Sequence, residues 1–149
     1  MKLVSFKYNN INDISWGILK DKHVLDLGNF FSITNIDSSI LDFFYSKDFL
    51  KENIKIFDDD NFKISNDKIS LLSPILNPTS LRDAYAFRQH VEAGRKSRGL
   101  DMIPEYDQFP VFYYGNHNAV SGPGEVRVQK DHSIKLDYEL EIAAIIGRK

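Results

Sequence analysis

The stretch KLVSFKYNNINDISWGILKDKHVLDLG, residues 2–28, alternates apolar runs with polar turns and predicts the fold of the amino-terminal part. KLVSFKY, SWGILK and HVLDLG have the length and the β-branched and aromatic content of strands. NNIND and KD lie between them and supply the asparagine and aspartate that turns favour. We therefore expect three short strands that are joined by turns.

The chain that follows this stretch predicts further small elements. SSILDFFYSKDFLKENI, residues 38–54, is typical of a helix, with Ser38 or Ser39 as its N-cap. DDDNF, residues 58–62, indicates a turn, and FKISNDKISLLSP, residues 62–74, indicates a hairpin. We predict a small amino-terminal α+β domain over residues 1–72. Its scattered polar residues favour a folding or interface module over a chemical site.

Composition bounds the function. A chain of 149 residues with 42% hydrophobic residues suits one ordinary domain, or a small domain and part of another. The formal net charge of −2 gives no electrostatic footprint for nucleic acid or an anionic membrane. The absence of cysteine excludes disulfides, thiolate metal sites and a cysteine nucleophile. No apolar segment approaches membrane-spanning length, so we expect a soluble, cytoplasmic protein.

SPILNPTS, residues 73–80, separates two regions of different composition, and its two prolines indicate a linker. The next stretch, SLRDAYAFRQHVEAGRKSRG, predicts a helix over residues 80–99. Ser80 and Asp83 have the spacing of a capping box, and cations followed by Gly99 suit the end of the helix. FPVFYY, residues 109–114, predicts an aromatic strand, and SGPG, residues 121–124, a turn.

LDYELEIAAIIG, residues 136–147, sets two glutamates inside what is otherwise an apolar strand pattern. Glu139 and Glu141 are two residues apart, so on a strand both point to one face. Paired carboxylates of this kind suit a hard divalent cation such as Mg²⁺, Mn²⁺ or Ca²⁺. The alternative is a strand face that simply meets water.

A metal site also needs a third oxygen ligand and a reactive group. Asp83 and His90 are seven residues apart, close to two turns of the predicted helix, and could supply a ligand and a general base. The alternatives are a capping role for Asp83 and an ordinary imidazole at position 90. If the helix frays or begins later, Asp83 could lie in the preceding loop, which suits a ligand better than a cap. Arg95 and Arg98 could bind a substrate carboxylate or could be solvated cations.

Three segments resemble, in order and at similar spacing, the fumarylacetoacetate hydrolase superfamily: LLSPILNPTSLRDAYAFRQHV (71–91), FPVFYYGNHNAVSGPGE (109–125) and LDYELEIAAIIGRK (136–149). The opening strands are also similar to the small amino-terminal domain of these enzymes. The resemblance implies a fold that is mainly β with helices (α+β), in which residues 73–149 form the first part of a β-roll catalytic domain. The alternative architecture is one compact α+β domain of the whole chain.

The resemblance also implies an activity, a cofactor and partners. It implies a Mg²⁺- or Mn²⁺-dependent hydrolase that cleaves a carbon–carbon bond in a diketo or oxo acid, as in aromatic catabolism, and that works as a homodimer. The roles it implies are a catalytic base for His90, metal ligands for Asp83, Glu139 and Glu141, and substrate contacts for Tyr113 and Arg98. The rivals are an isomerase or decarboxylase of oxo acids on the same scaffold, and a truncated, non-catalytic member.

The resemblance further implies that the family's fold continues beyond Lys149. A further acidic metal ligand, a substrate-binding lysine and the acidic partner of His90 are expected in that continuation. We therefore expect activity from a full-length form, and no turnover from the 149 residues alone.

Overall fold

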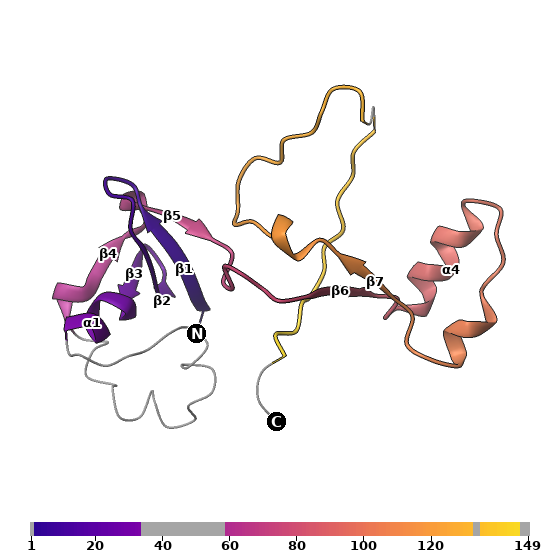
Figure 1. Cartoon of the computed structure of the whole chain (residues 1–149), viewed down its shortest axis with the longest axis horizontal. Helices are drawn as coiled ribbons and strands as arrows, with labels where there is room; N and C mark the ends of the chain where they lie inside the picture. The colour runs from indigo at the N-terminus through magenta and orange to yellow at the C-terminus, as the bar shows by residue number, and fades with distance from the viewer. Residues whose placement is uncertain (1, 34–58, 133–134, 147–149) are drawn as a thin grey trace. The chain divides into compact units, whose positions relative to one another are not determined.

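The computed structural model describes residues 2–32, 59–132 and 135–146 in full, and the backbone of residue 33 (Figure 1). By its internal contacts the chain divides into two compact units. One consists of Met1–Leu76 and Ser121–Lys149, and the other is Asn77–Val120. The predicted helix at residues 38–54 lies outside the described residues. The predicted domain boundary near residue 72 stays a prediction.

The first of these units, called the amino-terminal unit below, contains a five-stranded antiparallel sheet (Figure 1). Its strands are β1 (Lys2–Tyr8), β2 (Ile14–Lys20), β3 (His23–Asp26), β4 (Lys63–Ser65) and β5 (Ile69–Leu72), in the order β4-β3-β2-β1-β5. The three strands predicted from residues 2–28 are confirmed. Between β2 and β3, Asp21 takes a φ of 43°, a conformation that aspartate tolerates in tight turns.

The hairpin predicted at residues 62–74 is wrong in its pairing, although both of its strands form. β4 pairs with β3 and β5 pairs with β1, so the two strands lie at opposite edges of the sheet. Only the short 3₁₀ helix η3 (Asn66–Lys68) joins them. Four Cα steps span at most about 14 Å, whereas the edges of a flat five-stranded sheet are about 19 Å apart. The sheet must therefore curl, and curling brings Ile64 and Ile69 onto one cluster.

Apolar side chains pack on both faces of this sheet. Trp16, Ile18 and Leu25 form one buried cluster together with residues of helix α1 (Leu27–Ile33). The strand register places Phe6 and Val24 on the opposite face, in a second buried cluster. The 3₁₀ helix η2 (Asp60–Phe62), where a turn was predicted, begins at the N-cap Asp59 and places Phe62 against the first cluster.

Asp26 joins the sheet to helix α1. Its carboxylate is fully buried, and it accepts hydrogen bonds from the Tyr8 hydroxyl, from Ser15 Oγ at 2.5 Å and from the Asn29 backbone N–H at 2.9 Å. The last of these bonds satisfies an amide at the start of the helix, as a capping aspartate does. Three donors from three elements thus compensate the cost of burying one carboxyl group.

The unit Asn77–Val120 contains a pair of antiparallel strands and one longer helix (Figure 1). The strands are β6 (Leu81–Ala84) and β7 (Phe112–Gly115), and the helix is α4 (Arg88–Lys96). Two 3₁₀ helices, η4 (Pro104–Asp107) and η5 (His117–Ala119), lie in the connections.

The helix predicted over residues 80–99 begins about two turns too early, because helix α4 starts only at Arg88. Residues 81–84 are a strand, because pairing with β7 satisfies their backbone groups and the aromatic side chains of β7 offer Arg82 a surface. Ser80 does not cap the helix; its Oγ accepts a hydrogen bond from Arg82 Nη1. The predicted end is confirmed: helix α4 stops at Lys96, and Gly99 takes a φ of 70°, where glycine is favoured.

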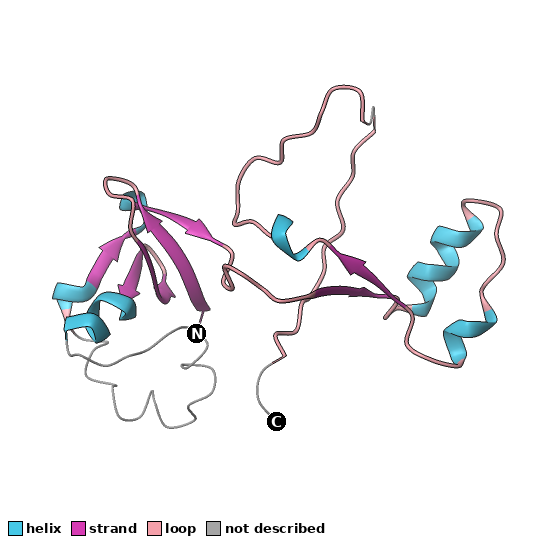
Figure 2. Ribbon diagram, in the orientation of Figure 1, coloured by secondary structure: helices cyan, strands magenta, loops and turns pink. Residues whose placement is uncertain are grey.

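The strand predicted at residues 136–147 is not formed: residues 135–146 contain no helix or strand (Figure 2). Leu140 and Ile142 are 95% and 99% exposed. A strand needs a neighbour for its backbone groups, and no described strand pairs with this segment. The described residues are α+β, with two antiparallel sheets and a few short helices, whereas the β-roll stays a prediction.

The chain passes very close to β5 at Gly122. A Cβ atom at this position would lie 2.5 Å from the carbonyl oxygen of Leu71 and 2.6 Å from Cα of Leu72. Both are backbone atoms that cannot swing aside, so only glycine fits. In the part of the chain that the structure describes, no helix is long and apolar enough to cross a membrane.

Candidate active site

Two of the predicted site residues lie opposite each other on the strand pair β6–β7. Asp83 faces Tyr113 across the two strands, and Arg82 faces Tyr114. Directly opposed residues share a face, with Cβ atoms about 4.5–5.5 Å apart. The side chains of Asp83 and Tyr113 therefore start from neighbouring positions on one exposed face. Tyr113 itself is 69% exposed, so a ligand can reach this face.

The other face of the same strands carries a cation between two aromatic rings. The Arg82 guanidinium carbon lies 5.6 Å from the ring centre of Phe112 and 5.2 Å from that of Tyr114. The two rings meet edge to face, with centres 5.1 Å apart and planes at 77°. The sequence interpretation missed this cluster because it placed Arg82 inside a helix. The available signal was the aromatic run of residues 112–114, which on a strand places Phe112 and Tyr114 on one face.

His90 is the third residue of helix α4 and is exposed. The prediction that Asp83 and His90 share one helical face is wrong, because Asp83 is on strand β6. The later start of the helix, after Asp83, is confirmed, whereas Asp83 lies on a strand and not in the expected loop.

The start of helix α4 is held by Arg88, which contacts three neighbours. Its guanidinium forms ion pairs with Glu92 at 2.9 Å and with Asp107 at 2.5 Å, and it lies over the ring of Tyr106 at 5.2 Å. The hydrogen bond to Asp107 is the main cause of a raised pKa of Arg88. These contacts tie the first turn, which carries His90, to the loop after the helix. No pattern in the sequence indicated that Arg88 would pair with Asp107.

The two arginines at the end of the helix contact backbone carbonyls. Arg98 Nε donates to the carbonyl oxygen of Gly94 at 3.0 Å, and Arg95 Nε donates to that of Asp101. Cations at this position also suit the helix dipole. Arg98 is exposed, and its role with a substrate carboxylate stays a prediction.

Glu139 and Glu141 lie in the segment without secondary structure, which belongs by its contacts to the other unit. Within residues 2–32, 59–132 and 135–146, no group of three or more histidine or acidic side chains is gathered closely enough to hold a metal ion. The chemistry of the predicted ligand set does fit: Asp83, Glu139 and Glu141 offer carboxylate oxygens, which hard divalent cations prefer. The ligand assignment stays a prediction.

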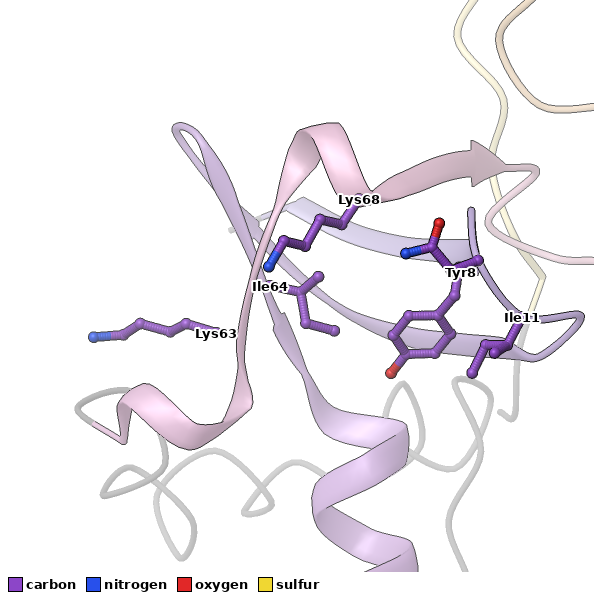
Figure 3. Close-up of a pocket in the computed structure, with 6 residues that line it drawn as sticks. Tyr8, Ile11, Lys63, Ile64 and Lys68 are labelled. Carbon is purple, nitrogen blue, oxygen red and sulfur yellow. The ribbon is translucent and has the colours of Figure 1, made fainter.

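A groove of about 300 Å³ lies in the amino-terminal unit (Figure 3). It is lined by Tyr8, Asn10, Ile11, Lys63, Ile64 and Lys68. The Tyr8 hydroxyl donates to Asp26, and Lys63 Nζ pairs with Asp60 at 2.6 Å. In Figure 3 the side chain of Lys63 points away from those of Tyr8 and Ile11. None of the six predicted site residues lines this groove.

Comparison with known protein families gives one relevant match. The model described as fumarylacetoacetate (FAA) hydrolase C-terminal matches residues 79–149. The matched segment contains all six predicted site residues. No curated protein and no solved structure gave a significant match.

Proposed function

Because residues 79–149 match the family model of the fumarylacetoacetate hydrolases, we propose that the protein is a divalent-metal-dependent hydrolase that cleaves a carbon–carbon bond in a diketo or oxo acid. The observation that carries the proposal is the family match over the segment that holds every predicted site residue. The cross-strand pair Asp83 and Tyr113 supports it, since it places an acidic residue and a tyrosine opposite each other on one accessible face.

In this proposal Asp83, Glu139 and Glu141 would hold Mg²⁺, Mn²⁺ or Ca²⁺ through their carboxylates. A cation bound there supplies polarisation of the substrate's keto-enol oxygens and stabilises negative charge that develops as the bond breaks. Carboxylates alone favour such hard ions over zinc or copper, which prefer nitrogen and sulfur ligands.

The other residues would bind substrate and move protons. His90 would take a proton from the attacking water, for which an accessible imidazole near the start of helix α4 is suitable. The hydroxyl of Tyr113 would hydrogen-bond a substrate oxygen beside Asp83. Arg98 would pair with a substrate carboxylate, in exchange for its hydrogen bond to its own helix.

Two measurements test the proposal. Calorimetric titration of the chain with Mg²⁺ and with Mn²⁺ measures binding of the cation. Product analysis with an acylpyruvate and with oxaloacetate, on the product of the complete reading frame, measures the reaction. Hydrolysis of the acylpyruvate to pyruvate and a carboxylate is the expected result. Release of carbon dioxide from oxaloacetate would point instead to a decarboxylase, and tautomerisation alone to an isomerase. If the chain bound neither cation, the result would point to a non-catalytic protein.

A further inference from the structure

We propose that Arg82 is a positioning residue, which fixes the register of β6 on β7 and thereby holds Asp83 opposite Tyr113. Its importance for activity rests on the proposed function, in which Asp83 is a metal ligand. The effect of Arg82 on the strand pair can be observed without any metal.

The strand pair needs a side-chain contact to fix its register. β6 and β7 have four residues each and form a two-stranded sheet. Two strands alone are marginally stable in water, and a slip of one residue moves every side chain to the other face. Such a slip would separate Asp83 from Tyr113.

The face that carries Asp83 has one contact that depends on the register, because the Leu81 side chain packs so closely over Gly115 that a Cβ there would lie 2.8 Å from Leu81 Cδ2. Leu81 lies opposite Gly115, which has no side chain, and Asp83 lies opposite the exposed Tyr113. The Arg82 face is different. There one guanidinium lies 5.6 Å and 5.2 Å from two ring centres and also donates to Ser80 Oγ at 3.2 Å. The two ring contacts of Arg82 depend on the register, whereas its bond to Ser80 is local, so on this face Arg82 is the residue that distinguishes one register from another.

Arginine suits this role better than lysine. Its planar guanidinium can stack on aromatic rings and at the same time donate hydrogen bonds in its own plane. The ammonium of lysine is instead a compact and strongly hydrated charge. Lysine keeps the positive charge near the rings and loses the planar contact. A lysine variant should therefore keep part of the effect, and a glutamine variant none of it.

The test compares Arg82→Gln and Arg82→Lys with the original protein and with Arg127→Lys, a control at an exposed arginine outside the proposed site. Nuclear magnetic resonance of the labelled chain gives two signatures. They are the upfield shift of the Arg82 side-chain protons by the two rings, and the backbone contact between Asp83 and Tyr113. Calorimetry gives the affinity for Mn²⁺. Tyr114→Leu removes one ring while Arg82 stays. If Arg82→Gln does not fold, this variant still tests whether the contact between Arg82 and the rings keeps Asp83 opposite Tyr113.

We expect Arg82→Gln and Tyr114→Leu to lose the Asp83–Tyr113 contact while the amide signals of helix α4 persist. The dissociation constant for Mn²⁺ should rise threefold to tenfold in Arg82→Gln, about twofold in Arg82→Lys and not at all in Arg127→Lys. A retained contact in both Arg82→Gln and Tyr114→Leu would overturn the proposal. If the original protein binds no Mn²⁺, the proposed metal site fails, and the backbone contact still decides the role of Arg82.

Discussion

Removing the hydroxyl of Tyr8 should destabilise the amino-terminal sheet. Tyr8→Phe keeps the ring, which meets Phe6 edge to face with centres 5.5 Å apart, and deletes only the donor to the buried carboxylate of Asp26. A hydrogen bond to a charged group contributes about 1.5–3 kcal/mol. Since Asp26 keeps two other donors, we expect a loss of about 2 kcal/mol in the free energy of unfolding.

Urea unfolding followed by tryptophan fluorescence measures this loss. The chain has one tryptophan, Trp16, which is 8% exposed and stacks on Phe31 in the core of the same unit. Its emission therefore reports the amino-terminal sheet and not the unit that holds helix α4. The control is Lys7→Gln, a change on β1 next to Tyr8 that leaves the hydrogen bonds to Asp26 intact. Phe31→Tyr would not serve as a control, because it changes the core around Trp16. A change below about 0.5 kcal/mol in Tyr8→Phe, the range of ordinary surface substitutions, would refute the reasoning.

The same network makes an alkaline pH dependence testable. Burial, and then the hydrogen bond to Asp26, raise the pKa of Tyr8 above its ordinary value of 10.0. Below pH 10 the hydroxyl is protonated in both folded and unfolded chains, so its full contribution is present. Above that pH the unfolded chain releases the proton first, and stability is lost as pH rises. The difference between the original protein and Tyr8→Phe should therefore shrink above pH 10, and a constant difference would contradict the assignment.

Three further predictions concern the candidate site and the close approach at β5. Replacing both Glu139 and Glu141 with glutamine should weaken calorimetric binding of Mg²⁺ or Mn²⁺ at least tenfold, about 1.4 kcal/mol, and unchanged affinity would remove them as ligands. In an active preparation, His90→Ala should lower kcat by about 10²–10⁴ with metal affinity intact, whereas Asp83→Asn should weaken both; normal turnover of the alanine variant would make His90 structural. Gly122→Ala should cost about 1–3 kcal/mol in urea unfolding, because its Cβ would meet backbone atoms, and a neutral result would show that the chain moves away.

The sequence predicted the local elements of the amino-terminal sheet well because its signals are local. Strand composition and turn residues alternate cleanly over residues 2–28, and β1, β2 and β3 follow them. The pairing of β4 and β5 was mispredicted for the opposite reason. Nearness in sequence favours a hairpin, whereas the curled sheet offers each strand a better apolar surface at a separate edge. That surface is built by Phe6 and Val24, far away along the chain.

The candidate site shows the same limit. Residue types could be chosen from chemistry, and the opposition of Asp83 and Tyr113 is compatible with the choice. The structural setting could not be predicted from the helical pattern of residues 80–99, because cross-strand pairing outweighs the intrinsic preference of Leu81–Ala84. Glu139 and Glu141 lie in a sequence with a strand pattern. A strand forms only where a neighbouring strand accepts and donates its backbone hydrogen bonds, and the pattern does not say whether such a neighbour exists.

The position of β5 beside β1 has a consequence for the order of events during synthesis. β1 can pair with β2, and β2 with β3, once Asp26 has been made, but the other neighbour of β1, which sets Leu72 opposite Ser5, is completed much later. At about 5–20 residues per second, the ribosome needs about 2–9 s for the chain between these two points. Throughout that interval the β1 edge of the nascent sheet has open backbone groups that can pair with another strand, and the β3 edge is open as well until β4 has been made. The amino-terminal sheet is thus most vulnerable to association while it is still being translated.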